Sequence, residues 1–410
     1  MPVSPRSVTF IGLGAMGHPM AARLHQHAPV ELTVFDVSAA AIARAAGIGR
    51  PAATIGAALR GADVIMTMLP ADAHVTEVAA QVREHARDGA ILVDFSTVHP
   101  DTIAAVAASL APRVGTVSAS CMKSVAAAVS GELTLYLGGD QALLSALDPL
   151  LAPMATTRID VGSQTGAKTL KLVNNLIVAS TNLAIADLAV LGASRQVSYA
   201  SLVAAFERAG LGGWALVNQV KKHTLADDLG PGRFSARYMA KDVTLATRIA
   251  DDRQVPRFLG GPVLAALRGA EAYGYGDHYH PVVIRWLETA ANVTPWPPGQ
   301  DGDAARAVIA DLCAAMAALD RLIAWHGLSL AVAAGMAAGP AAGALGQASA
   351  ESAALAEAAA DLAAERAVGR EQLAAVLDQA GALAIASHVP ALVIESAHDY
   401  LSYLAAGGLS

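Results

Sequence analysis

The stretch GSQTGAKTLKLVNNLIVASTN, residues 162–182, separates two kinds of sequence in this chain. Before it, short apolar segments alternate with helical patterns, and after it the pattern is helical throughout. The stretch opens on small and polar residues and continues into an apolar run, which predicts a helix that starts between Thr165 and Lys168. We therefore expect an α/β protein whose N-terminal domain alternates strands and helices and whose remaining domains are all-α.

Two side chains of this predicted helix could carry chemistry. Lys171 and Asn175 are four residues apart and so lie one turn apart on one face, whereas Asn174 points elsewhere. A lysine can move a proton and an amide can orient a substrate hydroxyl where two domains meet. A solvated lysine beside a capping asparagine fits the same letters, so this stretch alone leaves both interpretations open.

Composition narrows the class of protein. A chain of 410 residues has room for two or three domains. Mean hydropathy is +0.43, but we attribute it to alanine and expect charges to interrupt every apolar run before it reaches spanning length. No signal peptide is apparent, a net charge of −7 argues against nucleic acid, and Cys121 and Cys313 make no disulfide framework. The expected protein is cytoplasmic, with no membrane or nucleic-acid partner.

A glycine pattern follows the first predicted strand. Gly12, Gly14 and Gly17 form G-x-G-x-x-G at a strand-to-helix turn, with Ala15 and Met16 inside the loop. Such glycines permit a tight turn, a close approach of backbone to ligand and close packing of helix on strand. A pyrophosphate would sit on the free N–H groups at the helix start. We expect this loop to bind a dinucleotide in a Rossmann-like domain.

Asp36 indicates which dinucleotide. It ends the second predicted strand, ELTVFDV, nineteen residues beyond Gly17. A carboxylate there accepts hydrogen bonds from the adenosine ribose and repels a 2′-phosphate, and Val37 and Ser38 offer no arginine to hold one. NAD is expected, with NADP the less favoured alternative.

Two later strands end in residues suited to ligand binding. Residues 62–68 lead into Leu69 and Pro70, and residues 90–96 lead into Thr97. Carboxyl ends of parallel strands form the ligand edge of such sheets. We expect Leu69, Pro70 and Thr97 beside the cofactor and Ser96 beside the substrate, although capping of the next helix would also explain the two hydroxyl residues.

Several motifs together resemble the β-hydroxyacid dehydrogenases, the group of the 3-hydroxyisobutyrate, tartronate-semialdehyde and L-threonate enzymes, with 6-phosphogluconate dehydrogenase as a larger relative. These are GLGAMGHPM, MLP, DFST, SGELTLYLGG, GAKTLKLVNN and AKDVTLA, in order across roughly residues 5 to 290. The resemblance implies that Lys171 is the catalytic acid/base, that Asn175 orients the substrate and that Lys241 approaches the cofactor from the helical domain.

The chain departs from this resemblance in one loop. The family usually has D-A-P-V-S-G-G, whose serine and glycine hold the substrate carboxylate, whereas Met122, Lys123 and Ser124 stand here in place of S-G-G. Lysine can bind a carboxylate as a point charge, although without the geometry of those donors. We expect all three residues at the substrate, with a surface position for Lys123 as the alternative.

Two further features lie in the helical part of the sequence. Trp214 follows a predicted helix-loop turn and is a candidate wall of the substrate pocket or an ordinary core tryptophan. His278 and His280 are two apart with no clear companion ligand, so no metal is expected.

Residues 292–303 are rich in Pro and Gly and mark a boundary. We expect an NAD-binding domain over residues 1–164, a helical substrate and catalytic domain over 165–291, and a second helical domain over 304–410.

This last segment is rich in alanine, and it aligns with the helical domain before it. Residues 311–335 align with residues 171–195 at an offset of 140. Residues 376–392 align with residues 242–258 at an offset of 134. We interpret it as a degenerate repeat, with low complexity as the alternative. The second alignment pairs Val389-Pro390 with Val255-Pro256, and the counterparts of Lys171, Asn175 and Lys241 are Asp311, Ala315 and Ala375.

The expected function is hydride transfer between NAD and a small 3-hydroxy acid, or the corresponding semialdehyde or keto acid, in a monomer or in a homodimer with paired helical domains. A catalytically silent NAD-binding scaffold that binds partners through its helices is the alternative. The presence of Lys171 favours the enzyme.

Overall fold

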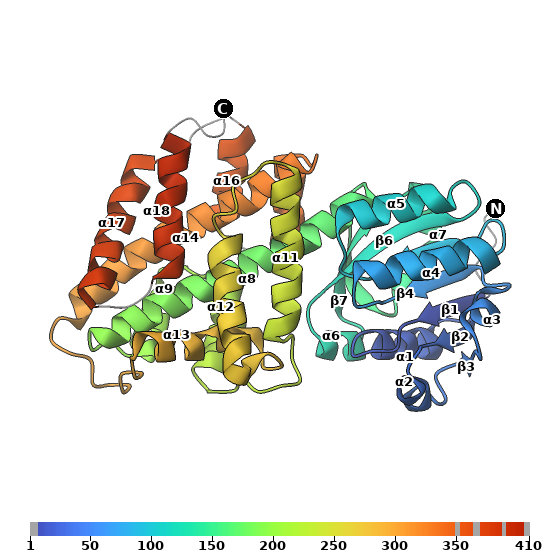
Figure 1. Ribbon diagram of the computed structural model, residues 1–410, viewed down its shortest axis with the longest axis horizontal. Helices are drawn as coiled ribbons and strands as arrows, with labels where there is room; N and C mark the ends of the chain where they lie inside the picture. Colours follow the sequence, from blue (N-terminus) through green and yellow to red (C-terminus); the bar gives the residue numbers. More distant parts are fainter. Residues whose placement is uncertain (1–6, 349–352, 364–369, 388–390, 406–410) are drawn as a thin grey trace. The chain divides into compact units, whose positions relative to one another are not determined.

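The computed structural model describes residues 7–348, 353–363, 370–387 and 391–405. They fall into two compact units, Met1–Lys171 and Leu172–Ser410, drawn along the sequence from blue to red in Figure 1. The units divide inside a helix, beyond the expected boundary at residue 164. The second unit contains both of the segments that we expected to be separate helical domains.

The first unit is built on one eight-stranded sheet with the order β3-β2-β1-β4-β5-β6-β7-β8. All neighbours are parallel except β6 and β7, which are antiparallel. The strands are β1 Ser7–Ile11, β2 Glu31–Phe35, β3 Arg50–Pro51, β4 Val64–Thr67, β5 Ile91–Asp94, β6 Gly115–Met122, β7 Leu133–Gly138 and β8 Ala155–Asp160.

Helices cover both faces of this sheet because its strands are apolar on both sides. In β4, Val64 and Met66 belong to a core shared with α1 and α7, whereas Ile65 belongs to a core shared with α4 and α5. The helices are α1 Gly17–His27, α2 Ala39–Arg44, α3 Ile55–Leu59, α4 Asp72–His85, α5 Pro100–Leu110, α6 Val125–Ser130 and α7 Gln141–Leu151.

The strand order reverses at β1, which lies between β2 and β4. Chain connections leave β1 and β4 toward opposite sides at this point, so a crevice opens at their carboxyl ends. The glycine loop follows β1, and Leu69 and Pro70 follow β4. Both expected cofactor segments therefore meet at the topological switch point.

Helix α8, Gln164–Ser194, begins in the first unit and continues as the central helix of the second. Its start at Gln164 lies one residue before the expected range of Thr165 to Lys168. Contrary to expectation, α8 is long and apolar enough to span a membrane, but its most apolar window is entirely buried within the protein. That burial accounts for its composition as a core helix.

In the described part of the second unit the regular elements are all helices, and two isolated β-bridges join Pro231 to His278 and Ser235 to Tyr279. After α8 come α9 Tyr199–Arg208, α10 Gly213–Ala215, the π-helix η1 Leu216–Thr224, α11 Ala236–Asp252, α12 Gly260–Ala270, the π-helix η2 Glu271–Tyr275, the 3-10 helix η3 His280–Val282 and α13 Val283–Ala291. A second set follows: α14 Ala305–Ala333, α15 Ala338–Ala348, α16 Ala353–Ala363, α17 Arg370–Ser387 and α18 Leu392–Ala405.

Five segments of the two sets match in order and length. At an offset of 140 residues, α8, α9 and the α10–η1 pair fall on α14, α15 and α16. At an offset of 134 residues, α11 and α12 fall on α17 and α18. The aligned pair Val389-Pro390 lies outside the described residues.

Glycines allow α8 and α14 to cross closely. Gly192 of α8 faces Leu312, and Gly327 of α14 faces Ile177, where a Cβ on Gly327 would lie 2.6 Å from the isoleucine Cδ1. The contacting positions run in opposite directions along the two helices, so the helices cross antiparallel. The second set is therefore packed against the first within one body.

Candidate active site

The glycine loop at the end of β1 has the shape that a pyrophosphate requires. Gly12 has φ +93° and a Cβ there would collide with the Met68 carbonyl, while a Cβ on Gly17 would collide with the Gly12 carbonyl. Gly14, by contrast, has no atom within 4 Å of an ideal Cβ. Gly12 and Gly17 are thus needed for packing, whereas Gly14 leaves an open cradle at the start of α1, near which Ala15 is exposed.

Asp36 holds this loop in place. Its Oδ2 accepts a hydrogen bond from Leu13 N at 2.7 Å, and its Oδ1 accepts one from Ser38 N at 2.8 Å. The carboxylate is half-buried, and Val37 beside it is 96% exposed. An anionic and an apolar surface therefore adjoin the glycine loop, as an adenosine ribose and its base require.

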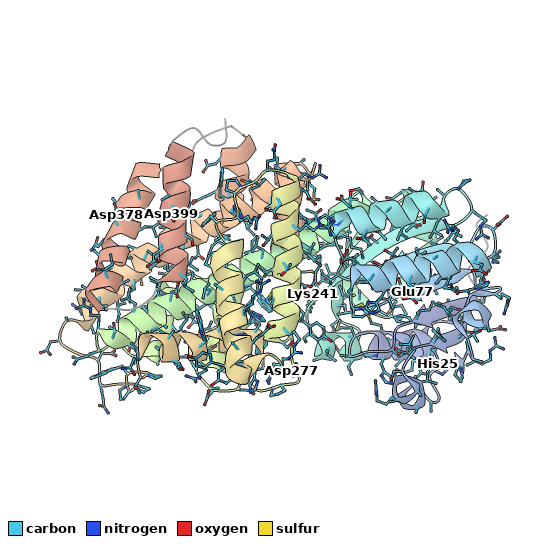
Figure 2. The ribbon with its side chains drawn as sticks, viewed as in Figure 1. His25, Glu77, Lys241, Asp277, Asp378 and Asp399 are labelled. Atoms are coloured by element: carbon cyan, nitrogen blue, oxygen red, sulfur yellow. The ribbon has the colours of Figure 1, made fainter. Side chains whose placement is uncertain are left out.

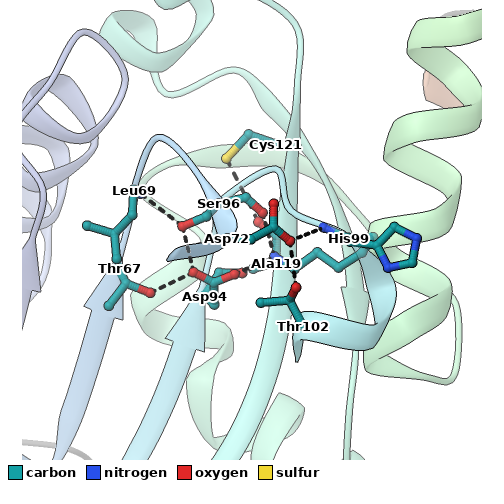
Figure 3. A network of polar contacts seen from close by, with 10 residues as sticks. Thr67, Leu69, Asp72, Asp94, Ser96, His99, Thr102, Ala119 and Cys121 are labelled. Carbon is teal, nitrogen blue, oxygen red and sulfur yellow. Dashed lines mark hydrogen bonds and ion pairs between the residues drawn. The ribbon is translucent and has the colours of Figure 1, made fainter. Parts of the chain in front are cut away.

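The ends of β4 and β5 are joined by buried hydrogen bonds, drawn in Figure 3. Ser96 Oγ donates to Asp94 Oδ1 at 2.7 Å and accepts from Leu69 N at 2.9 Å. Thr67 Oγ1 also donates to Asp94 Oδ1, at 2.7 Å. Ser96 is completely buried, so its hydroxyl fixes the turn before Thr97, which is half-buried.

Lys168 enters the same network and was not anticipated from the sequence. Its Nζ lies 2.7 Å from Asp94 Oδ2 and donates to the carbonyls of Asp94 and Ser96 at 2.9 and 2.7 Å. The side chains of Lys168 and Asp94 are fully buried. Nothing local in the sequence marks this pair, because its members are 74 residues apart.

The loop that departs from the family pattern is partly strained. Met122 ends β6 and is 2% exposed, whereas Lys123 is exposed with φ +76°. Lys123 Nζ donates to the Glu132 carbonyl at 2.8 Å. Ser124 is the exposed residue before α6 and makes no side-chain cap. A lysine thus occupies a left-handed conformation that favours glycine.

Lys171 is half-buried on α8, one turn beyond Lys168. Burial raises the pKa of the Cys121 thiol to about 12, while the charges of Lys171 and Lys168 act in the opposite direction. Both ammonium groups are therefore close enough to the end of β6 to act on the thiol.

In the second unit, Asn175 is buried and belongs to a separate network. Asn175 Nδ2 donates to Asp242 Oδ2 at 2.6 Å, and Lys241 Nζ lies 2.8 Å from Asp242 Oδ1. Asn174 Nδ2 reaches Asn175 Oδ1 at 3.4 Å. Asp242 is 2% exposed, and Lys241, labelled on α11 in Figure 2, is partly exposed. The structure thus joins the two expected residues through Asp242.

Trp214 lies elsewhere in the second unit. It lines a hollow of about 490 Å³ together with residues of α9 and η1 and with Gly346 and Gln347 of α15. The neighbouring Gly212 faces Ile185, ten residues beyond Asn175 on α8 and so about 15 Å along its axis. His280 is buried and bonded to Gln219 at 2.9 Å, and burial lowers its pKa to about 3.

The glycine cradle, the carboxylate after β2 and the switch point define a Rossmann-type protein that binds a nicotinamide dinucleotide. Residues 7–165 match the model of the NAD binding domain of 6-phosphogluconate dehydrogenase, and residues 166–287 match that of the NAD-binding region of NADP-dependent 3-hydroxyisobutyrate dehydrogenase. The chain belongs to the 3-hydroxyisobutyrate dehydrogenase family of β-hydroxyacid dehydrogenases. It is thus a dehydrogenase that acts on the CH–OH group of a small hydroxy acid.

Two relatives illustrate the match. The NAD-dependent L-serine dehydrogenase of Pseudomonas aeruginosa is 29% identical over 293 residues, which cover 69% of this chain and 98% of the relative. A probable mitochondrial 3-hydroxyisobutyrate dehydrogenase of Dictyostelium discoideum is 30% identical over 295 residues, which cover 69% and 91%.

Solved structures extend the comparison to the second set of helices. The Mycobacterium tuberculosis 3-hydroxyisobutyrate dehydrogenase with L-serine has a TM-score of 0.64 and 28% identity, covering 69% of this chain and 99% of its own. The Plasmodium falciparum 6-phosphogluconate dehydrogenase has a TM-score of 0.69 at 13% identity and covers 97% of this chain and 92% of its own. This second likeness shows a shared fold that includes the C-terminal helices.

Proposed function

We propose that this protein oxidises a small 3-hydroxy acid with NAD, or reduces the corresponding semialdehyde or keto acid, and that Lys171 is the acid/base. The observation that carries the proposal is the order of side chains on α8 and α11. Lys171 precedes Asn175 by one turn of α8, and Asn175 is tied through Asp242 to Lys241. A proton-handling group, an orienting amide and a second ammonium are thus fixed in one series.

In this mechanism Lys171 Nζ takes the proton of the substrate hydroxyl, and returns it in the reverse direction. Asn175 donates to the hydroxyl oxygen, and Asp242 fixes the rotation of that amide. Lys241 is held by the same carboxylate, and we assign it to cofactor binding. NAD, when bound, supplies the acceptor for the hydride of the carbinol carbon, and the protein supplies orientation.

NAD is preferred over NADP because of the residues at the end of β2. Asp36 would meet the ribose hydroxyls, and its charge would repel a 2′-phosphate. The exposed neighbour is Val37 in place of an arginine. The open cradle at Gly14, with Ala15 and Met16, would receive the pyrophosphate, and Leu69, Pro70 and Thr97 would border the nicotinamide side.

The acid end of the substrate would bind near the strained loop. Lys123 supplies an exposed positive charge and Ser124 an exposed hydroxyl, with Met122 beneath them. Ser96, by contrast, is best assigned to the turn that positions Thr97, because its hydroxyl is buried with a donor and an acceptor. We leave Trp214 out of the substrate site because its hollow contains neither Asn175 nor Lys241.

The substrate class follows from the relatives. L-Serine and 3-hydroxyisobutyrate each carry a hydroxymethyl group on the carbon next to a carboxylate, which fits one amide, one lysine and one anion site. The test is a screen of 3-hydroxy acids with NAD and with NADP, followed by the absorbance of the reduced cofactor. Turnover of at least one acid with NAD, absent in Lys171→Met, is expected. NAD binding without turnover of any acid would instead support the silent scaffold.

We further propose that the second set of helices is a degenerate repeat that supplies the packing partner of the first. The matching helix order and the close crossing of α8 with α14 support this. The positions that correspond to Lys171, Asn175 and Lys241 are Asp311, Ala315 and Ala375, so one active site is expected in each chain. A cytoplasmic monomer is the proposed state.

A further inference from the structure

Lys168 is the largest charged side chain that is completely buried among the described residues of the first unit. Its ammonium has three oxygen partners within 2.9 Å, namely Asp94 Oδ2 and the carbonyls of Asp94 and Ser96. The ammonium is thus ion-paired with one carboxylate oxygen and donates hydrogen bonds to two carbonyls, so its charge is held on three sides. A buried charge held by three oxygen atoms fixes the start of α8 against translation along its axis and against rotation about it.

The partners of Lys168 all belong to the ligand edge of the sheet. Asp94 ends β5, and its other oxygen accepts from Thr67 of β4 and from Ser96. Ser96 in turn accepts from Leu69 N. One ammonium thus connects α8 to the segments that carry Leu69 and Thr97, as Figure 3 shows for the strand ends.

Lys171 follows Lys168 by three residues, so the two side chains leave α8 in similar directions, about 4.5 Å apart along its axis. Both act on the Cys121 thiol at the end of β6. The two lysines therefore leave α8 toward the same strand edge, where Lys168 is held by three oxygen atoms.

We propose that Lys168 is a positioning residue of the reaction, which sets Lys171 against the turn of Ser96 and Thr97. This inference rests on the proposed function, because it is Lys171 that moves the proton. A rigid connection suits this task, since a shift of about 1 Å in a reacting group can reduce the rate about a hundredfold. Asp94 is then the anchor through which Lys168 acts.

The test is the double variant Lys168→Met/Asp94→Asn. Removal of the lysine alone would leave a buried carboxylate unpaired, whereas the double change removes both charges and keeps an amide oxygen to accept from Thr67 and Ser96. We expect kcat with L-serine or 3-hydroxyisobutyrate to fall about ten- to a hundredfold, while KM and the Kd of NAD change less than about threefold. The deuterium isotope effect on kcat should rise, because transfer becomes slower relative to product release. Lys222→Met, which removes an exposed lysine of η1, should leave all these values unchanged.

Wild-type kcat and isotope effect in the double variant would overturn the proposal. So would a lower kcat with an unchanged isotope effect once rates are corrected for the fraction of protein that binds NAD, because that result describes only a loss of folded enzyme. If the wild type turns over no acid, the proposed function fails, and the positioning claim is judged by the rate at which acetic anhydride acetylates Lys171. An altered rate in the double variant supports it, and an equal rate in both proteins refutes it.

Discussion

Lys171 is the residue whose loss should separate chemistry from cofactor binding. We expect Lys171→Met to lower kcat by about a hundredfold or more, because a general acid/base typically contributes at least this much to the rate. NAD binding, followed by fluorescence titration, should remain nearly intact. Lys221→Met, which removes a surface lysine paired with Glu207, is the matched control. A Lys171→Met protein that keeps more than about a tenth of kcat would remove Lys171 from this role.

Asp36 should determine the affinity for NAD and the choice of dinucleotide. Loss of its charge-assisted hydrogen bond in Asp36→Ala should weaken NAD binding by roughly 1.5–3 kcal/mol. The same change should reduce the preference for NAD over NADP. Isothermal titration with both dinucleotides measures the two effects. A wild-type preference for NADP would contradict the assignment.

Lys123 combines a charge with a strained backbone, and two variants separate these properties. Lys123→Gly should relieve the left-handed conformation and raise the free energy of unfolding by up to about 1 kcal/mol, whereas Lys123→Ala should not. Both should raise KM for an acidic substrate more than they lower kcat, because a carboxylate anchor acts in ground and transition states alike.

Urea unfolding and steady-state kinetics of the Lys123 pair give the answer. If alanine stabilised the protein as much as glycine, strain would not be the cause. An unchanged KM for every acid tested would show that Lys123 is a surface residue that does not bind the substrate.

The sequence predicted some of these residues because their signals are local. The glycine loop and Asp36 occur in a short pattern whose chemistry can be read from neighbouring residues, whereas the role of Lys171 is implied by the resemblance of GAKTLKLVNN to the family. Lys168 could not be predicted in this way, because a lysine at a helix start normally lies in solvent and its partner Asp94 is distant in sequence. The burial of the Ser96 hydroxyl depended in the same way on pairing between β4 and β5.

At the scale of single elements, the first turn of α18 depends on a buried carboxylate. Asp187 of α8 is 1% exposed and its Oδ2 accepts from Val393 N at 2.9 Å. Burial raises the pKa of Asp187 to about 8, with a further increase from Glu395 and a decrease from the Val393 N–H. This pKa lies above the ordinary value of 3.8 for the unfolded chain.

The folded state therefore binds the extra proton between about pH 4 and pH 8. The stability linked to Asp187 is fully present below the unfolded pKa and is lost as pH rises through the folded one. We expect the free energy of unfolding of wild type, relative to Asp187→Asn, to fall with pH across this window by up to about 1.4 kcal/mol per unit. Chemical unfolding at several pH values measures it, and parallel profiles for the two proteins would show that Asp187 does not titrate there.

Most elements could be predicted because their apolar period is strong over several turns or strand pairs. The strands expected over residues 62–68 and 90–96 form as β4 and β5, with shorter bounds. Strand β3 was missed, because it has two residues, one of them Pro51, and exists only through its pairing with β2 at the sheet edge. The π-helix η1 has no sequence pattern of its own.

At the scale of the whole molecule, the C-terminal helices should be required for a soluble monomer. A chain truncated at Pro298 loses α14, whose buried residues include Leu312, Leu319 and Leu322. It also loses Asp320, which accepts from Gly212 N at 2.8 Å. Helices rich in alanine bury little area each, so many must dock together for stability.

We therefore expect the truncated protein to aggregate or to dimerise through the exposed face of α8. Light scattering after gel filtration, with the full chain as control, distinguishes these outcomes from a monomer. A soluble and fully active truncated monomer would show that the C-terminal helices are dispensable, and the repeat proposal would then fail.

The repeat could be proposed from sequence because a fixed offset aligned two long segments. Its packing could not, since alanine-rich helices align easily with one another and the crossing depends on two particular glycines. The end of the first unit could not be predicted from the sequence either, because α8 continues without interruption across the division between Lys171 and Leu172.

Position 187 of α8 corresponds to Gly327 of α14 at the offset of 140 residues. One holds the carboxylate that receives the first turn of α18, and the other is a glycine packed against Ile177. In a symmetric dimer of two identical chains, a substitution at one of these positions would appear in both subunits at once. If the second set is a repeat of the first, one gene encodes both halves and this constraint is removed. Each half of the contact can then evolve toward a different task, and on this proposal the aspartate and the glycine are an example.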